Sequence, residues 1–494
     1  MTFTRRQSLK AGGTLSVFAA IGACTRSGAS GETNIDAMDA VETAFRISQK
    51  DITASEATEA AIARAELINP KINGIVTKTY DEARKNAADP KAGPFGGVPT
   101  FVKDLNDVIG IATGNGSNAF KDHIARSQFP FVSEFERNGF ISLGKSSTPE
   151  FGLTATTEPA SSGVTRNPWN LNHSTGGSSG GASALVAAGV VPLAHASDGG
   201  GSIRIPASCC GTVGLKVSND RYPLARDESK IPVRISVQGC ETRTVRDTAA
   251  FLAAMELRVG PLPEVGMVTE PARKRLKIGF FTATPTGVAV STEVVVRTKE
   301  AAALCETLGH KVEEMVAPFN DEIADDFLLY WAAFASSAIE RWEKAAGITA
   351  TEAHFERFTF GLRDHFVANQ EKMRPAILKL IGFAQVYRET IADYDLILSP
   401  VLTTPPPEIG YLDTSIDYET AIERLLGYAQ FTSLGNVAGA PSISLPLGMS
   451  STGLPIGALF NGKMGQERTL LELAYELEEA APWIGRKPTV FAAG

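Results

Sequence analysis

Residues 174–206 read STGGSSGGASALVAAGVVPLAHASDGGGSIRIP, and the rest of the chain is organised around this stretch. Two glycine-rich turns, 176–181 and 199–201, bracket a predicted small-residue helix and a short apolar strand. Ser178 lies in the first turn and Ser202 follows the second. Glycine clusters let backbone N–H groups point into open space and let a ligand approach the main chain. The pattern therefore indicates a nucleophile beside an oxyanion hole, which is an active site.

Length and composition are those of a soluble globular protein. The chain has 494 residues, 43% of them hydrophobic and 21% charged, with a formal net charge of -8. This length could form one large domain or two or three ordinary ones. Because no repeat or long low-complexity linker is visible, we expect a single continuous domain over 31–494. The acidic balance argues against nucleic acid or an anionic membrane as a partner.

The first 30 residues have the pattern of an export signal. Arg5 and Arg6 form a twin-arginine pair, and a modest apolar run over 11–23 follows them. This run is too short to span a bilayer, so a Tat-type signal is expected over 1–30. The sequence Ile-Gly-Ala before Cys24 resembles a lipobox, which would make Cys24 a lipid anchor. The predicted location is the periplasm, free or tethered as a lipoprotein; the alternative is a basic N-terminus with an incidental arginine pair.

The other four cysteines are expected to be small buried side chains. Cys209 and Cys210 are neighbours, which does not suit a disulfide, and neither they nor Cys240 and Cys305 have metal-ligand spacing. We therefore predict no metal site.

Hydrophobic patterns predict the order of the elements. Two amphipathic helices are expected over 36–70, the second ending at Asn69-Pro70. Helices and strands then alternate to about residue 260, which favours an α/β fold with a substantially parallel, buried sheet. A largely helical, aromatic region over 319–393 precedes a strand at 395–402, a hairpin over 441–460 and a final helix over 466–480.

Lys103 is the discriminating residue of the N-terminal half. It follows the apolar run Val98-Pro-Thr-Phe-Val within a predicted strand. A charged lysine is costly to bury, so burial would shift it toward its neutral form, which is a competent general base. The alternative is a lysine at a strand end whose ammonium reaches solvent.

Three simpler interpretations compete at the glycine turns. Gly139 to Ser146 matches the P-loop expression, but an apolar strand lies inside the supposed loop. Gly176 to Gly180 matches the nucleophile elbow of α/β-hydrolases, which needs a buried strand before it and a late histidine base. Neither requirement is evident. Glycine turns that merely pack a helix on a sheet would not need a serine in each turn or a lysine in an apolar strand.

Taken together, Lys103 in GVPTFVKD, Ser178 in GGSSGG and Ser202 in DGGGSIRIP resemble the amidase signature family. The segments GKSSTPE at 144–150, NPWN at 167–170 and CGTVGLK at 210–216 also fit. The likeness runs from about 36 to 486 and is densest over 94–250. It implies a large mixed, mostly parallel twisted sheet enclosed by helices, and a Ser–cis-Ser–Lys triad with a cis peptide before Ser178.

The resemblance also implies the roles of the site residues. Neutral Lys103 would accept a proton through Ser178 while Ser202 attacks a carbonyl carbon. Backbone N–H groups around the second turn would hold the oxyanion: Gly199, Gly200, Gly201 and Ser202. Asp198 and Arg204 are expected to hold the two loops in place. Supporting positions are Thr175, Gly177 and Ser179, of which Ser179 is also a candidate donor.

The chain departs from many relatives at two positions. Ser197 stands where many have Thr, and Gly199 stands where a larger residue is often found, so we expect a wider pocket or a looser oxyanion loop. The segments 156–159, 166–170 and 195–198 are similar to those of the nylon-oligomer (6-aminohexanoate cyclic dimer) amidases of the family.

The predicted function is that of an exported serine amidohydrolase of small amides, anilides, esters or carbamates, with no metal and no cofactor. We expect a small-molecule amide substrate, no nucleic-acid partner, and a monomer or homodimer. One alternative is a glutaminyl-tRNA amidotransferase A-type subunit that releases ammonia from glutamine; the export signal counts against it. Another is a catalytically silent exported binding lipoprotein, against which the retained triad counts. Substrate choice is assigned to residues 319–393.

Overall fold

The computed structural model describes residues 38–223, 231–257, 260–318 and 321–492. The predicted export signal, with Cys24, lies outside these ranges. Within them, no helix has both the length and the apolar character needed to cross a membrane. The four cysteines expected to be buried and unpaired are so.

A mixed eight-stranded sheet forms the centre of the molecule, in the order β10-β9-β11-β13-β12-β7-β8-β6. The predicted hairpin is confirmed as the antiparallel pair of β12 and β13. The strands are β6 (Leu193–Asp198), β7 (Val213–Lys216), β8 (Val237–Thr242), β9 (Lys277–Phe280), β10 (Lys311–Glu314), β11 (Leu396–Pro400), β12 (Ser442–Met449) and β13 (Pro455–Asn461).

The expectation of mostly parallel pairing is wrong for this sheet. Only β10 with β9 and β9 with β11 pair parallel, and the other neighbouring strands pair antiparallel. The crossover from β6 through α7 (Arg204–Cys210) to β7 does leave these two strands parallel, but β8 returns between them. Alternation of helices and strands in the sequence gives no sign of such an inserted strand.

A second sheet brings Lys103 to the central one. It has the order β1-β3-β2, formed by β1 (Ile75–Lys78), β2 (Pro99–Lys103) and β3 (Ile141–Ser146). Strand β2 lies beside β6, where Thr100 Oγ1 donates to the carbonyl of Leu193 at 2.9 Å. Because Lys103 is the last residue of β2, its side chain lies near the end of β6, where the second glycine turn begins.

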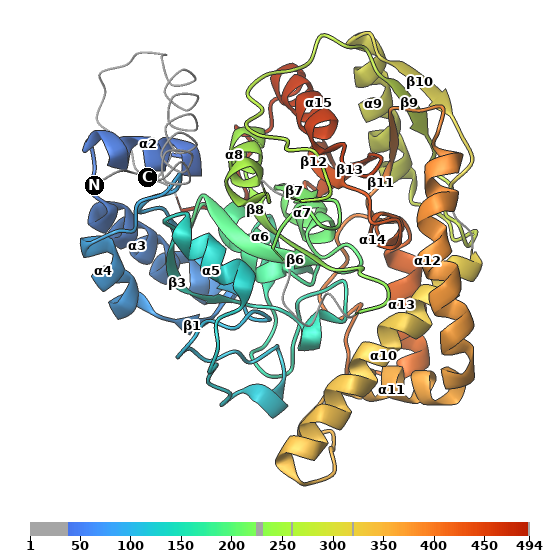
Figure 1. The fold of residues 1–494 in the computed structure, drawn as a ribbon, viewed down its shortest axis with the longest axis horizontal. Helices are drawn as coiled ribbons and strands as arrows, with labels where there is room; N and C mark the ends of the chain where they lie inside the picture. The colour runs from blue at the N-terminus through green and yellow to red at the C-terminus, as the bar shows by residue number, and fades with distance from the viewer. Residues whose placement is uncertain (1–37, 224–230, 258–259, 319–320, 493–494) are drawn as a thin grey trace, which may run out of the picture.

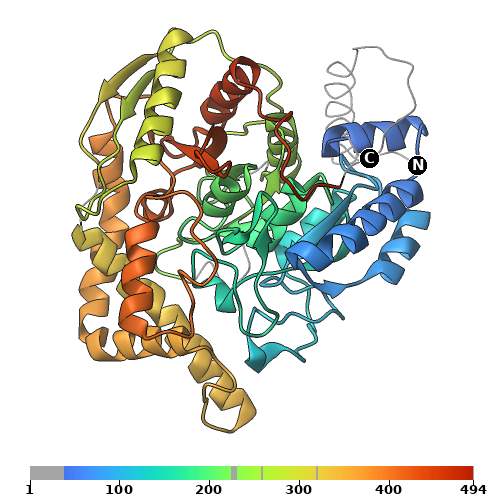
Figure 2. The same ribbon diagram turned by 180° about the vertical axis from the view of Figure 1, so that it is seen from behind.

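The helices cover the two ends and the faces of the sheets (Figures 1 and 2). The second predicted N-terminal helix does not end at Pro70: it continues to Ile72 and stops at Asn73, whose backbone is left-handed. Pro70 lies inside the last turn, and the Asn69 side chain accepts the N–H groups of Gly74 and Ile75 just beyond the helix. The helices of this half are α2 (Ala40–Gln49), α3 (Ala54–Ile72), α4 (Tyr80–Ala88), α5 (Pro130–Arg137), α6 (Gly180–Ala187) and α8 (Val245–Met255).

The region expected to be largely helical at 319–393 is so from residue 321 onward, with a non-helical segment over 347–356. Its helix α10 packs against α11 and α12, at the end of the molecule opposite α2–α4 (Figures 1 and 2). The helices of this half are α9 (Thr292–Thr307), α10 (Asp321–Ala346), α11 (Arg357–Asn369), α12 (Met373–Thr390), α13 (Tyr418–Tyr428), α14 (Ser433–Val437) and α15 (Glu467–Ala480). Short elements complete the fold: β4 (Arg166–Asn167) with β5 (Asn170–Ser174), and the 3-10 turns η2 (Asn118–Phe120), η3 (Glu150–Gly152) and η5 (Gln370–Lys372).

Candidate active site

The two glycine turns converge, as the sequence predicts. The first joins β5 to α6, and the second joins β6 to α7. The Ser179 N–H donates to the carbonyl of Ser202 at 3.3 Å and ties one turn to the other. The peptide between Gly177 and Ser178 is cis, as the family resemblance implies. Both candidate serines are buried, with Ser178 2% and Ser202 7% exposed.

Lys103 points into this convergence and not to solvent, because its side chain is fully buried. Its Nζ is 2.8 Å from the Oγ atoms of both Ser178 and Ser179. It is also 3.1 Å from Ser197 Oγ and 3.4 Å from the Ser197 carbonyl oxygen. The lysine and the first serine of the predicted relay are therefore in direct contact.

Burial sets the protonation state of Lys103. It lowers the pKa of the amine to about 7, while the charges of Asp198 and Glu241 act in the opposite direction. About half of the molecules then carry a neutral amine near pH 7, whereas an ordinary lysine would be almost wholly protonated there. A neutral amine has the lone pair that a general base needs.

His195 is a supporting residue whose role the sequence did not reveal. The Lys103 N–H donates to His195 Nδ1 at 3.1 Å, so the ring proton is on Nε2, which is 3.1 Å from Gln238 Oε1. Burial lowers the pKa of His195 to about 3, and the ring is neutral. It fixes the backbone of Lys103 at the end of β2. The sequence signal that could have revealed this role was the position of His195 within the alternating pattern of β6.

The peptide between Gly200 and Gly201 is held at both ends. Its carbonyl accepts Thr432 Oγ1 at 2.6 Å, and its N–H donates to Asp198 Oδ1 at 2.8 Å. The N–H of Gly201, which was expected among the oxyanion donors, is thus already bonded to Asp198. Thr432, which lies 232 positions after Gly200 in the chain, was not predicted.

The next peptide has a defined direction as well. The Gly201 carbonyl accepts the Ile205 N–H at 2.7 Å, inside the first turn of α7. Since C=O and N–H point in opposite directions across a trans peptide, the Ser202 N–H points away from that helix. Across the described ranges, no hydrogen bond holds the N–H groups of Gly199, Gly200 or Ser202.

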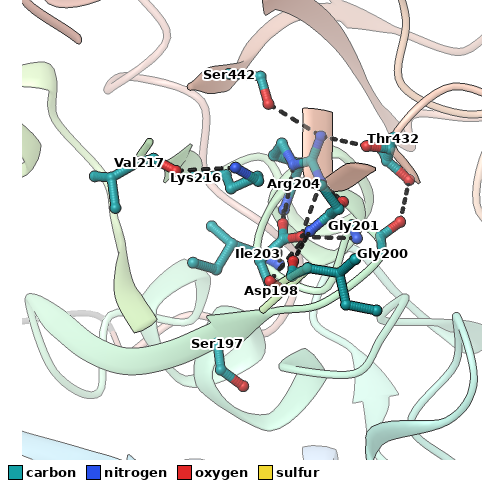
Figure 3. A network of polar contacts seen from close by, with 12 residues as sticks. Ser197, Asp198, Gly200, Gly201, Ile203, Arg204, Lys216, Val217, Thr432 and Ser442 are labelled. Atoms are coloured by element: carbon teal, nitrogen blue, oxygen red, sulfur yellow. Dashed lines mark hydrogen bonds and ion pairs between the residues drawn. The ribbon is translucent and has the colours of Figure 1, made fainter. Parts of the chain in front are cut away.

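A buried ion pair supports this loop (Figure 3). Arg204 Nε and Nη2 lie 2.9 and 2.8 Å from the two carboxylate oxygens of Asp198, and both side chains are fully buried. Arg204 Nη1 also donates to the Thr432 carbonyl at 2.6 Å and to Ser442 Oγ at 3.0 Å. Burial alone would raise the pKa of Asp198, but Arg204 holds it well below its usual range. The pair anchors the second glycine turn to the segment that precedes α14. The first glycine turn is joined to the second by the hydrogen bond from Ser179 to Ser202.

The other expected supporting residues have local roles. Thr175 Oγ1 donates to the Gly176 carbonyl at 3.0 Å, and Ser179 Oγ donates to the Ser197 carbonyl at 3.1 Å. Gly177 has no room for a side chain, since a Cβ there would lie 2.3 Å from the Thr156 carbonyl oxygen. Each therefore shapes the first turn.

Glu150, in η3, joins the core to the helical region. Its carboxylate accepts Ser117 Oγ at 2.6 Å, the Glu356 N–H at 2.8 Å and Thr359 Oγ1 at 2.5 Å. Burial and the neighbouring Glu356 raise the pKa of Glu150 to about 7. The residues that follow Glu150 line the cavity described next.

A cavity of about 100 Å³ opens at Ser202. Its polar lining consists of Thr154, Ser202, Gln430 and Ser433, and none of the described residues that line it is charged. The remainder is glycine and apolar side chains, many of them from α10 and α13: Phe327, Leu328, Trp331, Ile422, Leu425 and Leu426. Such a surface suits an uncharged ligand.

The competing motifs do not have the geometry they need. Lys145 of the P-loop match lies inside β3, with Nζ donating to the Asn106 carbonyl at 2.7 Å and to Thr113 Oγ1 at 2.9 Å. It cannot reach a phosphate. The strand before the elbow match, β5, is short and only partly buried. In the described ranges, no group of three or more His, Cys, Asp or Glu side chains is placed to hold a metal ion.

Comparison with known proteins agrees with this geometry. The sequence profile of the family described as Amidase matches residues 56–471. The chain belongs to the amidase family. As a member, it is a hydrolase of amide C–N bonds with the amidase signature fold.

Individual amidases are similar over nearly the whole chain. The AmiC protein of Mycobacterium leprae is 42% identical over 456 residues, 92% of this chain and 97% of AmiC. The 6-aminohexanoate-cyclic-dimer hydrolase of Paenarthrobacter ureafaciens is 34% identical over 479 residues, 91% of this chain and 96% of that protein. A structure of a 6-aminohexanoate cyclic dimer hydrolase with its substrate superposes with a TM-score of 0.85 at 32% identity, covering 92% of this chain and 99% of the other.

Proposed function

We propose that the amidase hydrolyses small uncharged amides through an acyl-enzyme on Ser202. The observation that carries the proposal is the 2.8 Å contact of buried Lys103 Nζ with Ser178 Oγ, where the two glycine turns meet. A base, a relay hydroxyl and a second serine facing an apolar cavity are the parts that acyl transfer needs.

The proposed reaction begins with proton transfer. Neutral Lys103 accepts the proton of Ser178 Oγ, which takes the proton of Ser202 Oγ as that oxygen bonds to the carbonyl carbon. The carbonyl oxygen becomes negative and is held by the N–H groups of Gly199, Gly200 and Ser202. Loss of one such donor typically costs about 10²–10³ in rate. Gly201 supports this hole through Asp198 and does not donate to it.

The leaving nitrogen then receives a proton from Ser178, and the C–N bond breaks. Water attacks the ester that remains on Ser202; its proton returns through the same relay, and the carboxylic acid is released. The amine product and the acid account for every atom of substrate and water.

The cavity supports an uncharged substrate. Glutamine carries an ammonium and a carboxylate, and no charged side chain among the described lining residues could pair with either. This disfavours the amidotransferase alternative. A relative solved with its substrate is a cyclic-dimer amide hydrolase, which supports a small amide as the ligand class.

The test is a panel with a p-nitroanilide, a primary aryl amide, a p-nitrophenyl ester and an aryl carbamate. Wild type is compared with Ser202→Ala and Lys103→Ala. We expect turnover in wild type and a loss of about 10³-fold or more in both variants. Amide turnover that survives Ser202→Ala would contradict the assigned nucleophile. No turnover of any compound would favour a narrow substrate outside the panel or a missing partner.

We also propose that residues 1–30 direct export and that Cys24 is lipidated, on the strength of the twin-arginine pair and the residues before Cys24. Fractionation of cells that express the full chain tests this. Replacement of Arg5 and Arg6 by lysine should retain the protein in the cytoplasm, and Cys24→Ala should release it from the membrane fraction. An unchanged distribution in both variants would contradict the proposal.

A further inference from the structure

Two glycines of the oxyanion loop lie directly beneath aromatic side chains of α10. A Cβ on Gly199 would be 3.1 Å from Trp331 Cζ3 and 3.2 Å from its Cη2. A Cβ on Gly200 would be 3.3 Å from Phe327 Cζ. These distances are shorter than ordinary van der Waals contact, so a side chain at either position would push the aromatic ring back by a few tenths of an ångström.

Space, and not backbone conformation, requires glycine at position 199. The φ angle of Gly199 lies outside the left-handed region, unlike that of Gly201 at 137°. The φ angle of Gly199 therefore does not itself call for glycine. The expectation of a pocket widened at Gly199 therefore needs revision, because the Trp331 indole fills the room that the missing side chain leaves.

The indole is held in place from two sides. Trp331 Nε1 donates to the Leu153 carbonyl at 3.2 Å, in a loop that also lines the cavity. The rings of Phe327 and Trp331 stack one helical turn apart, with centroids 5.8 Å apart and an interplanar angle of 19°. The two rings form an aromatic wall of the cavity that opens at Ser202.

We propose that Trp331, with Phe327, selects the acyl group, and that the preferred substrates are amides with a flat apolar acyl group such as an aromatic ring. This inference rests on the proposed acyl-enzyme function. An aromatic acyl group gains stacking on the wall when the carbonyl oxygen enters the adjacent hole, whereas a terminal carboxylate finds no partner in the lining. Acyl-group specificity thus comes from Trp331 of α10, whose indole occupies the space beside Gly199.

The first test compares acyl groups on one leaving group. Benzoyl, acetyl and succinyl p-nitroanilides differ only in the acyl part. We expect wild type to prefer benzoyl and to discriminate against succinyl. Trp331→Ala should lower kcat/KM for the benzoyl compound about three- to tenfold more than for the acetyl compound. Trp331→Phe, which keeps a flat ring, should lose less. Equal losses on both compounds would overturn the proposal.

The second test is reciprocal. Gly199→Val places a side chain where Trp331 lies and should lower benzoyl turnover. Adding Trp331→Ala should restore a part of that loss, so that the double variant exceeds Gly199→Val alone. Gly382→Val on α12, where a Cβ would meet nothing within 4 Å, is the matched control and should retain wild-type turnover. A double variant no more active than Gly199→Val would overturn the packing argument.

Labelling with a serine-reactive fluorophosphonate distinguishes failure of the specificity proposal from failure of the proposed function. If Ser202 is labelled in every variant while acyl preference does not change, the specificity assignment is wrong and the proposed function stands. If wild type neither turns over an anilide nor becomes labelled, the proposed function itself is wrong.

Discussion

The pKa of Lys103 predicts a pH profile that can be measured directly. With a pKa of about 7, the neutral amine amounts to about a tenth of the molecules at pH 6, half at pH 7 and nine-tenths at pH 8. If the neutral amine is the base, kcat/KM rises about tenfold between pH 6 and pH 8 and is flat above it. With the ordinary value of 10.5, kcat/KM would instead continue to rise about tenfold per pH unit beyond pH 9.

Other groups near the site must be separated from this rise. His195, with a pKa of about 3, stays neutral throughout the range. Asp198, held ionised by Arg204, does not titrate there. Glu150 does, because its pKa is about 7, and it becomes charged as the pH rises. Glu150→Gln removes that titration and leaves Lys103 in place, so the variant should retain the same inflection.

The assay is the initial rate of p-nitroanilide hydrolysis at low substrate, which gives kcat/KM of the free enzyme. It is run from about pH 5.5 to 9.5 at constant ionic strength, because surface charges are screened by salt. A profile that rises without a plateau, or an inflection that disappears in Glu150→Gln, would refute the assignment of Lys103 as the base.

Three further predictions concern stability and the loop. The folded state of Lys103 binds fewer protons than the unfolded state between about pH 7 and 10.5, so burial costs about 4 kcal/mol at pH 7 and about 2 kcal/mol at pH 9. Lys103→Met removes this cost but also loses the hydrogen bonds of the lysine. The free energy of unfolding should therefore rise by about 2 kcal/mol at pH 7 and not change at about pH 9. Denaturant titration at the two pH values checks both expectations. Thr432→Val should lower kcat about tenfold with little change in KM, and Thr432→Ser should restore it, because only the hydroxyl holds Gly200; an equal loss in both would contradict this. Asp198→Asn should destabilise the fold by about 3–5 kcal/mol in thermal or denaturant unfolding, because Arg204 is left as an unpaired buried charge.

Local sequence patterns were sufficient to predict most residues of the candidate site. The glycine turns around Ser178 and Ser202, and a lysine in an apolar strand, have few other uses. Lys103 and Ser178 are in contact as predicted, and the two turns are joined by the hydrogen bond from Ser179 to Ser202. The hairpin of β12 and β13 was also readable, since two short apolar runs flank a turn sequence.

What the sequence did not disclose depends on partners distant along the chain. Thr432 is an ordinary threonine until the fold places it against Gly200, and Trp331 is one of many aromatic residues until it lies over Gly199. The direction of the Gly201 N–H is decided by a single bond to Asp198. Likewise, the antiparallel pairing of β8 with both β6 and β7 follows from the return of β8 between them, which no local period encodes.

The most direct test of the central claim is intact-mass and peptide analysis after reaction with a serine-reactive fluorophosphonate. The proposed chemistry predicts one adduct per chain, on Ser202, formed faster as the pH rises through about 7 and much more slowly in Lys103→Ala. It also predicts no adduct in Ser202→Ala. An adduct on Ser178 or elsewhere, or labelling that persists in Ser202→Ala, would contradict the assignment of Ser202 as the nucleophile.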